Sequence, residues 1–363
     1  MHAPESPSSP ALLTRPIILD EILLHTHHRQ RIQQATSLDE LADAVRQHPQ
    51  WVRSLIDKGV KVRYIGRAVR ELDRQVFRQI TSLLATPELL EHICILVMGS
   101  EGRGEQVVKT DQDNALIADD TYPAEALQVF RLAFTAALTR LGYPPCPGDV
   151  MLCNPVWGCG LEALQNRMLS WMNNPTPTHL MQLAICYDAR VVAGQQRLFD
   201  RARAFFWEHL PDNPAFYAHL ARPVLAFKTP LGWFNRLLVE KGTRQGQIEL
   251  KKGGIFPIVH GVRTLALEQR LKDPNTVRRI NGLMRKGVLE RALGADLTEV
   301  FEFMTTLRVR ARVENQARQG SGDDYLLLET LGRLERESLR ECFIVVDQFK
   351  SLITHHFRLR MLQ

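Results

Sequence analysis

Two aspartates separated by one residue are the side chains best suited to chemistry in this sequence. Asp111 and Asp113 lie in the segment KTDQDNALIAD, where an apolar run follows them directly. On a strand, residues two apart point to the same face, so both carboxylates would project together. A divalent cation would relieve their mutual repulsion, and oxygen ligands favour Mg²⁺, with Mn²⁺ as the alternative. We therefore predict Asp111 and Asp113 as metal ligands and catalytic residues.

A glycine-rich turn just upstream could hold phosphate. The segment reads ICILVMGSEGRGE, so an apolar run ends in Gly-Ser and a short turn follows. Glycine lets the backbone approach a phosphate closely, the serine hydroxyl can donate to it, and a helix beginning near Gly102 would add oriented N–H groups. An arginine can bind phosphate through two N–H groups, and a lysine can act as a point charge. The predicted nucleotide-binding residues are Gly99, Ser100, Gly102, Arg103 and Lys109.

Together, the turn and the carboxylate pair predict chemistry on a nucleoside triphosphate such as ATP or UTP. A third carboxylate normally completes such a site, as a shared ligand or as the base that takes the acceptor proton. The sequence offers Asp149, in PGDVM, and Asp188, in CYDAR. We favour Asp149 as the third catalytic residue. Asp188 would then be a structural group in an ion pair with Arg190.

The apolar patterns around the motif predict an α+β fold with a small mixed sheet. The continuous apolar run at 93–98 is typical of a buried strand, and 113–118 would be the second strand. A helix should follow from 123 to 141, with proline in its first turn. A strand is expected near 149–153, and a further helix at 161–172.

Four regions are expected along the chain. Residues 1–16 are rich in proline and serine and would be a disordered lead-in. Residues 17–90 show helical spacing of apolar side chains and would form a helical N-terminal region. The nucleotidyl-transfer core would span 91–197. Residues 198–363 would form an all-helical C-terminal domain that ends in one long helix from 325 to 357.

Charge and composition restrict the class of partner. The 363 residues carry a net charge of +6, which suits anionic ligands such as nucleotides. Basic residues are spread among helices without interleaved aromatic side chains, so we do not expect nucleic acid as a partner. No apolar run approaches the ~20 residues that span a bilayer, and no secretory signal begins the sequence. The six cysteines contain no C-x-x-C pair and fit no common zinc spacing, so a reduced, cytoplasmic protein is expected.

At these residues the chain resembles the nucleotidyltransferase superfamily, whose signature is Gly-Ser followed by Asp-x-Asp. The run GSEGRGE…TDQDNALI is more closely similar to the catalytic N-terminal domain of protein-PII uridylyltransferase. It is especially similar to a bacterial family of nucleotidyltransferases in signal-transduction proteins, often fused to CBS and cyclic-nucleotide-binding domains. Further similar blocks are CPGDVMLCNPVW at 146–157, CYDARVVAG at 186–194, TPLGWF at 229–234, ELKKGGIFPIV at 249–259, VRTLAL at 262–267 and LERESLR at 334–340.

The resemblance covers roughly residues 60–355 and implies transfer of a nucleoside monophosphate from a triphosphate to a protein or small-molecule acceptor. The C-terminal blocks resemble the family's presumed substrate-binding domain. There, Lys251 and Lys252 lie in a glycine-flanked turn and would reach the nucleotide or the acceptor; a solvated basic turn is the alternative. Glu249 and His260 stand where the resemblance leads us to expect aspartates, which puts a role for those two positions in doubt.

No CBS or cyclic-nucleotide-binding domain is recognisable before the core, so regulation would come by another route or from a separate chain. Two other functions are compatible with the sequence. One is a catalytically silent nucleotide-binding regulatory module, although a pure binder need not retain both aspartates. The other is a helical interaction protein that docks a partner through its C-terminal helix.

Overall fold

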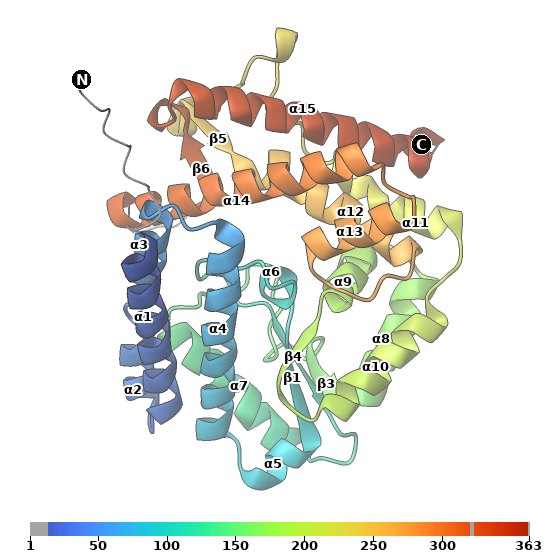
Figure 1. Ribbon diagram of the computed structural model, residues 1–363. Helices are drawn as coiled ribbons and strands as arrows, with labels where there is room; N and C mark the ends of the chain where they lie inside the picture. Colours follow the sequence, from blue (N-terminus) through green and yellow to red (C-terminus); the bar gives the residue numbers. More distant parts are fainter. Residues whose placement is uncertain (1–13, 320–322, 362–363) are drawn as a thin grey trace, which may run out of the picture.

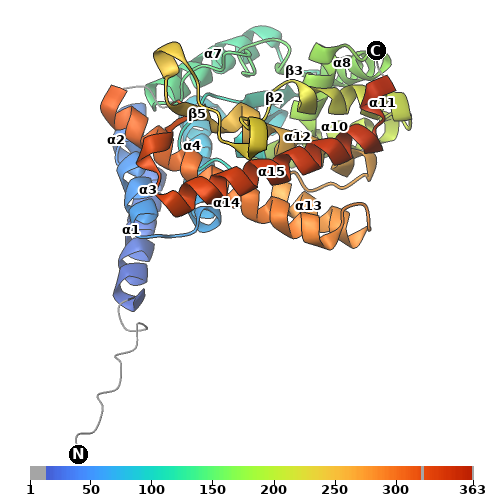
Figure 2. The ribbon, with the colours of Figure 1, turned by 90° about the horizontal axis from the view of Figure 1, so that it is seen from above.

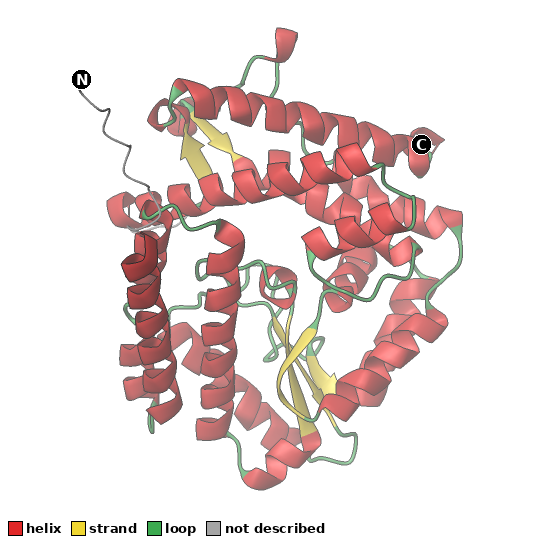
Figure 3. Ribbon diagram, viewed as in Figure 1, coloured by secondary structure: helices red, strands yellow, loops and turns green. Residues whose placement is uncertain are grey.

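A small mixed sheet lies at the centre of the molecule and helices surround it (Figures 1 and 3). The computed structural model describes residues 14–319 and 323–361. The sheet has four strands in the order β3-β2-β1-β4, with β1 antiparallel to both neighbours and β3 parallel to β2. The strands are β1 (Ile93–Val97), β2 (Asn114–Ala118), β3 (Gly158–Gly160) and β4 (Arg190–Gly194). The predicted α+β class is confirmed.

The central strands are buried on both faces, which explains their continuous apolar sequence. Ile93, Ile95 and Val97 of β1 belong to one hydrophobic core, whereas Cys94 and Leu96 belong to a second core. Side chains alternate across a strand, so the sheet separates the two cores. Figure 1 shows α4 (Val62–Leu84) and α7 (Ala124–Arg140) on one side of the sheet and α8 (Leu161–Asn173) and α10 (Gln196–His209) on the other.

The N-terminal region is helical, as predicted, and packs on the first core. Its long helix α4 has apolar side chains on one face and is tied to the core by a buried hydrogen bond: the Tyr143 hydroxyl donates to the Asp73 carboxylate at 2.5 Å. The predicted lead-in at 1–16 falls mostly outside the described residues. The helices here are α1 (Thr14–Gln34), α2 (Leu38–Val45), α3 (His48–Asp57), α4 (Val62–Leu84) and α5 (Pro87–His92).

Four helices follow the first two strands and cover the sheet. They are α7 (Ala124–Arg140), α8 (Leu161–Asn173), α9 (Pro177–Tyr187) and α10 (Gln196–His209). Helix α10 packs on α8 and on β1, so the packing around the sheet continues past residue 197, the boundary predicted for the core. The boundaries of the four predicted regions therefore remain predictions.

The C-terminal part consists mainly of helices and lies above the sheet in the view of Figure 1. Its two long helices, α14 and α15, pack side by side (Figures 1 and 2). No described helix is long and apolar enough to cross a membrane. The α-helices are α11 (Pro214–Ala221), α12 (Phe256–Glu268), α13 (Thr276–Arg285), α14 (Arg291–Gln319) and α15 (Arg333–His356). Short elements complete it: η2 (Arg222–Leu225), η3 (Trp233–Asn235), η4 (Gly242–Arg244), β5 (Gln247–Glu249), the π-helical η5 (Lys251–Ile255), β6 (Tyr325–Leu327), η6 (Leu328–Thr330) and η7 (Leu359–Met361).

Two predicted elements differ from the structure. The segment 149–153 runs beside β2 but forms no strand, because Asn114 takes its hydrogen bonds: the Asn114 N–H donates to the Val150 carbonyl, and its side chain accepts from the Leu152 N–H. The third strand is β3 instead. The predicted helix at 325–357 is divided, since Tyr325–Leu327 pairs with β5 and the helix begins only at Arg333. The C-terminal part is therefore mainly helical but not all-helical, because it contains the two-stranded sheet of β5 and β6.

Candidate active site

The carboxylate of Asp113 lies directly against the backbone of Gly99. Antiparallel pairing of β1 and β2 brings these two positions together, and the Met98 N–H donates to the Asp113 carbonyl at 2.8 Å. Gly99 has a φ of +55°, and a Cβ atom there would stand 2.1 Å from Asp113 Oδ2. Only glycine fits this close approach at this backbone angle. The turn and the second aspartate of the predicted pair therefore form one unit.

Asp111, Asp113 and Cys146 form a group that could hold a metal ion. One donor atom from each lies within 4.8 Å of the others, and the Cys146 thiol is 3.3 Å from Asp113 Oδ1. Burial, and then the nearby charge of Asp111, raise the pKa of Asp113 to about 6. A cation would offset the cost of keeping this carboxylate ionised. The carboxylate oxygens therefore fit a divalent ion such as Mg²⁺ or Mn²⁺, whereas the Cys146 sulfur would be a softer third donor than these ions prefer.

Asp149 and Asp188, the two candidates for the third carboxylate, both lie outside this group of potential metal ligands. Asp149 is exposed in a turn with a φ of 54°, and its carboxylate accepts from the Asn154 side-chain amide at 2.8 Å. Asp188 is fully buried among arginines. Sequence reasoning missed Cys146, which was set aside with the other cysteines because their spacing fits no zinc pattern. The position of Cys146 in the CPGD turn, which also contains the candidate Asp149, could have indicated that it lies near the site.

The glycine-rich turn is a single helical turn, α6 (Gly99–Gly102), so the predicted helix near Gly102 ends at that residue instead of beginning there. The Ser100 hydroxyl donates to the Gln106 side chain at 3.3 Å, and the Thr110 hydroxyl donates to the same oxygen at 2.9 Å. A Cβ at Gly102 would stand 2.4 Å from the Asp188 carbonyl oxygen. Gly102 thus allows the turn to pack on the chain near β4.

Arg103 and Glu105 dock this turn onto the C-terminal helices. The Arg103 guanidinium donates to Glu105 at 2.7 Å and to Asp188 at 2.8 Å, and its side chain is mostly buried. Glu105 in turn accepts from the backbone N–H of Thr276, at the start of α13, at 2.6 Å. Both carboxylates outweigh the effect of burial and raise the pKa of Arg103. The guanidinium that we predicted to bind phosphate is therefore engaged by two carboxylates.

The Asp188 carboxylate forms ion pairs with three arginines from three parts of the chain. Its carboxylate accepts from Arg103 behind the turn, from Arg263 of α12 at 2.6 Å and from Arg279 of α13 at 2.7 Å. It does not pair with Arg190, so that expectation was wrong. Burial alone would raise the pKa of Asp188, but the three guanidinium groups lower it below its usual value. The ion cluster holds the turn and both C-terminal helices in one arrangement.

The three lysines predicted to bind the nucleotide or the acceptor lie in two different parts of the structure. The Lys109 ammonium donates to the Leu141 carbonyl at 2.7 Å, and burial lowers its pKa to about 8. Lys251 is exposed on η5, and its charge acts on Asp113 from the C-terminal part of the chain. Lys252 is exposed beside Glu249 at 3.9 Å. Of the three, Lys251 is the one whose charge acts on Asp113.

A buried glutamate also borders the site and was missed by the sequence reasoning. Glu101, in the middle of α6, is only 7% exposed. Burial, followed by the charges of Asp73 and Asp113, raises its pKa well above the usual value. Its neutral form avoids a third negative charge beside Asp113.

Comparison with protein families agrees with this geometry. Residues 46–178 match the family described as "Putative nucleotidyltransferase DUF294", and residues 214–357 match the one described as "Putative nucleotidyltransferase substrate binding domain". The two matches together cover about three quarters of the chain. Residues 46–178 therefore belong to the first of these families and residues 214–357 to the second. No curated protein matches the chain.

Replacing Gly99 by alanine should weaken metal binding. The new Cβ would collide with the Asp113 carboxylate and displace it, so we expect Mn²⁺ affinity, measured by calorimetry, to fall by about 10- to 100-fold. Gly142→Ala is the matched control, since Gly142 also has a positive φ of 86° but a Cβ there would meet no atom within 4 Å. Equal affinities in the two variants would contradict the close contact between Gly99 and Asp113.

Replacing Asp188 by asparagine should strongly destabilise the fold. Three buried guanidinium groups would lose their shared counter-charge, and breaking a buried ion cluster in this way costs about 3–5 kcal/mol. Asp200→Asn is the control, because Asp200 pairs with Arg203 at the surface and should contribute less than about 1 kcal/mol. Urea unfolding of both variants measures the difference. A loss at Asp188 no larger than at Asp200 would refute its structural role.

His260 should make stability fall as the pH is lowered below neutral. Burial, and then the charge of Arg263 beside its Nδ1 atom, lower its pKa to about 3, although the hydrogen bond between its Nε2 atom and the Leu220 carbonyl acts in the opposite direction. Between this value and the unfolded value of ~6.5, the unfolded chain binds the extra proton, which costs up to about 1.4 kcal/mol per pH unit. Urea unfolding at pH 6 and pH 5 should therefore show a smaller pH slope in His260→Gln than in the natural protein. Identical slopes would contradict a neutral, buried His260.

Proposed function

We propose that this protein transfers a nucleoside monophosphate from a triphosphate, ATP or UTP, to a protein or small-molecule acceptor. The observation that carries the proposal is the contact of the Asp113 carboxylate with Gly99, which joins the predicted metal pair to the predicted phosphate turn. Membership of the nucleotidyltransferase family supports it. In the reaction, an acceptor atom would bond to the α-phosphorus, and pyrophosphate would leave as the acceptor loses its proton.

In this proposal Asp111 and Asp113 hold Mg²⁺ or Mn²⁺, and Cys146 lies beside them as the third donor. A bound divalent ion would neutralise phosphate charge and align the triphosphate. Gly99 and Ser100 would accommodate the phosphates, because they begin the glycine-rich turn that lies against the carboxylate of Asp113. The Ser100 hydroxyl donates to the Gln106 side chain at 3.3 Å in this structure, and it would turn from Gln106 to donate to a phosphate.

The remaining predicted residues take different roles. Gly102 and Arg103 would act on the site by holding the turn, as their packing on Asp188 suggests. Lys109 would support the site from behind through the Leu141 carbonyl. Lys251 would contact the triphosphate or the acceptor, because its charge reaches Asp113 from the C-terminal domain. Lys252 is the less suitable candidate, since Glu249 lies beside it. We do not assign catalysis to Asp149, which is exposed and bonded to Asn154.

The resemblance to protein-PII uridylyltransferase further suggests a uridylyl- or adenylyltransferase of a bacterial signalling system, acting in the cytoplasm. The domain that matches the substrate-binding family would select the acceptor.

A catalytically silent nucleotide-binding module is the second candidate. It is favoured by one observation: among the described residues, the group that could hold a metal has the Cys146 thiol, and not a carboxylate, beside Asp111 and Asp113 as its third potential ligand. The two functions separate in one experiment, because a silent module would bind a triphosphate and release no pyrophosphate.

Asparagine at both Asp111 and Asp113 should abolish nucleotidyl transfer. The natural protein, given each α-labelled triphosphate with Mg²⁺ or Mn²⁺ in a cell lysate, should label an acceptor and release pyrophosphate. The double variant should lose at least about 100-fold of this rate, since it removes the charges that hold the ion.

Asp149→Asn is the matched control and should keep the rate within about twofold, because an exposed hydrogen bond is worth little. Saturable triphosphate binding without any product would favour the silent module. A large loss in Asp149→Asn would restore Asp149 as the third catalytic carboxylate.

A further inference from the structure

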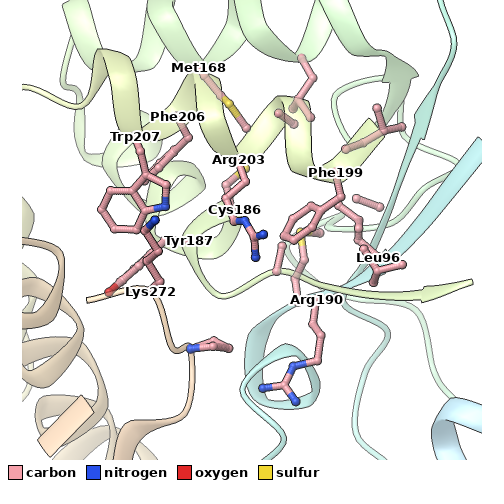
Figure 4. A pocket seen from close by; sticks show the side chains of 18 of the residues that line it. Leu96, Met168, Cys186, Tyr187, Arg190, Phe199, Arg203, Phe206, Trp207 and Lys272 are labelled. Carbon is pink, nitrogen blue, oxygen red and sulfur yellow. The ribbon is translucent and has the colours of Figure 1, made fainter. Parts of the chain in front are cut away.

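A cavity of about 500 Å³ lies between the sheet and the helices α8 and α10 (Figure 4). Side chains of β1 and β2, such as Leu96 and Ile117, form its floor, and Met168, Phe199 and Phe206 form its walls. This volume is within the ~300–1,000 Å³ of pockets that bind small molecules. Most of the lining is apolar and aromatic, so the cavity suits a ligand with an apolar body. We call it the α10 cavity.

The α10 cavity is separate from the candidate active site. None of Gly99, Ser100, Asp111, Asp113 and Cys146, all of which the structure describes, is among its lining residues. It lies close to the site nevertheless. Its lining includes Met98, which precedes the turn, and the neighbours of Asp188 on both sides.

The lining of the cavity carries an excess of positive charge. Four cations belong to it, Arg190, Arg203, Lys272 and Arg278, and Asp273 is its one lining carboxylate. Figure 4 shows Arg190 at the rim, below the aromatic side chains. Arg203 pairs with Asp200 and Arg278 pairs with Asp273, in both cases near the surface, where such pairs are weak.

Arg190 and Lys272 have no carboxylate partner in residues 14–319 and 323–361. Arg190 is half-buried. Burial lowers its pKa, as do the nearby charges of Arg70, Arg278 and Arg74, whereas the charge of Asp273 raises it. An arginine among other cations, with no carboxylate within ion-pair distance, is a ready partner for an anion at the rim of an apolar cavity.

We propose that the α10 cavity binds a small carboxylic acid with an apolar body, whose carboxylate meets Arg190 at the rim. The proposal does not depend on the nucleotidyl transfer proposed above. An apolar chain would fill the space between the sheet and α10, while the planar guanidinium would receive both carboxylate oxygens.

Decanoate and decanol are the probes, because they share an apolar chain and differ in charge. Titration into the natural protein, followed by calorimetry and by the fluorescence of the lining residues Trp157 and Trp207, should show one saturable decanoate site. Decanol should bind at least about tenfold more weakly. Absence of saturable decanoate binding, or equal affinity for decanol, would overturn the proposal. Tighter binding of decyl phosphate than of decanoate would overturn the assignment to a carboxylate.

Two arginine variants test the rim. Arg190→Gln should weaken decanoate binding about tenfold and leave decanol unchanged. Arg197→Gln is the matched control: it is an exposed arginine on the same helix as Arg203, outside the cavity lining. Unchanged decanoate affinity in a folded Arg190→Gln variant would overturn the role of Arg190. If Arg190→Gln does not fold, Arg190→Lys replaces it, and an affinity equal to that of the natural protein would contradict the paired binding of both carboxylate oxygens.

Two further experiments test where the ligand binds. Ala202→Phe should abolish binding of both probes, because Ala202 lines the cavity and is nearly fully buried. ATP with Mg²⁺ should not displace decanoate. Displacement would show that the cavity belongs to the nucleotide site, and it would overturn a separate site without affecting the proposed transfer reaction.

Discussion

The rest of this structure depends on one buried carboxylate, that of Asp188. It lies at the end of α9 and accepts hydrogen bonds from Arg103, Arg263 and Arg279, which come from the glycine-rich turn, α12 and α13. Asp188 falls between the two family-matched ranges, whereas its three partners lie within them. A buried carboxylate cannot remain ionised without such partners, and the arginines cannot be buried without it. The ion cluster therefore fixes how the two matched parts meet.

The geometry of the candidate active site follows from this cluster. Arg103 holds the turn from behind, and Gly102 packs on the Asp188 backbone, so the turn has little freedom to move away from the sheet. On its other side Gly99 rests against Asp113. The carboxylate pair and the turn are thus held in position before any ligand arrives, which lowers the cost of ordering them on binding. The N-terminal helices contribute less directly, through the hydrogen bond between Tyr143 and Asp73.

Much of the fold could be predicted from local sequence. The apolar run of β1 and the spacing in α4 identify their elements because each pattern is confined to one segment. The meeting of Gly99 and Asp113 follows from antiparallel pairing of the strands beside them. Cys146 and the partners of Asp188 could not be predicted in this way. Their roles depend on contacts between residues far apart in sequence, such as the 91 positions that separate Asp188 from Arg279. The predicted strand at 149–153 was wrong for a related reason, because the Leu152 N–H of this segment donates to the side chain of Asn114.

The central claim is that Asp111 and Asp113 bind the ion that holds a triphosphate at the glycine-rich turn. Anomalous X-ray diffraction from crystals soaked with Mn²⁺ and a non-hydrolysable triphosphate tests it most directly. We predict one strong manganese peak in contact with both carboxylates, with phosphate oxygens beside Gly99 and Ser100. The distance from the peak to the Cys146 sulfur would show whether the thiol is a ligand. A triphosphate bound elsewhere, or manganese away from the two carboxylates, would contradict the account.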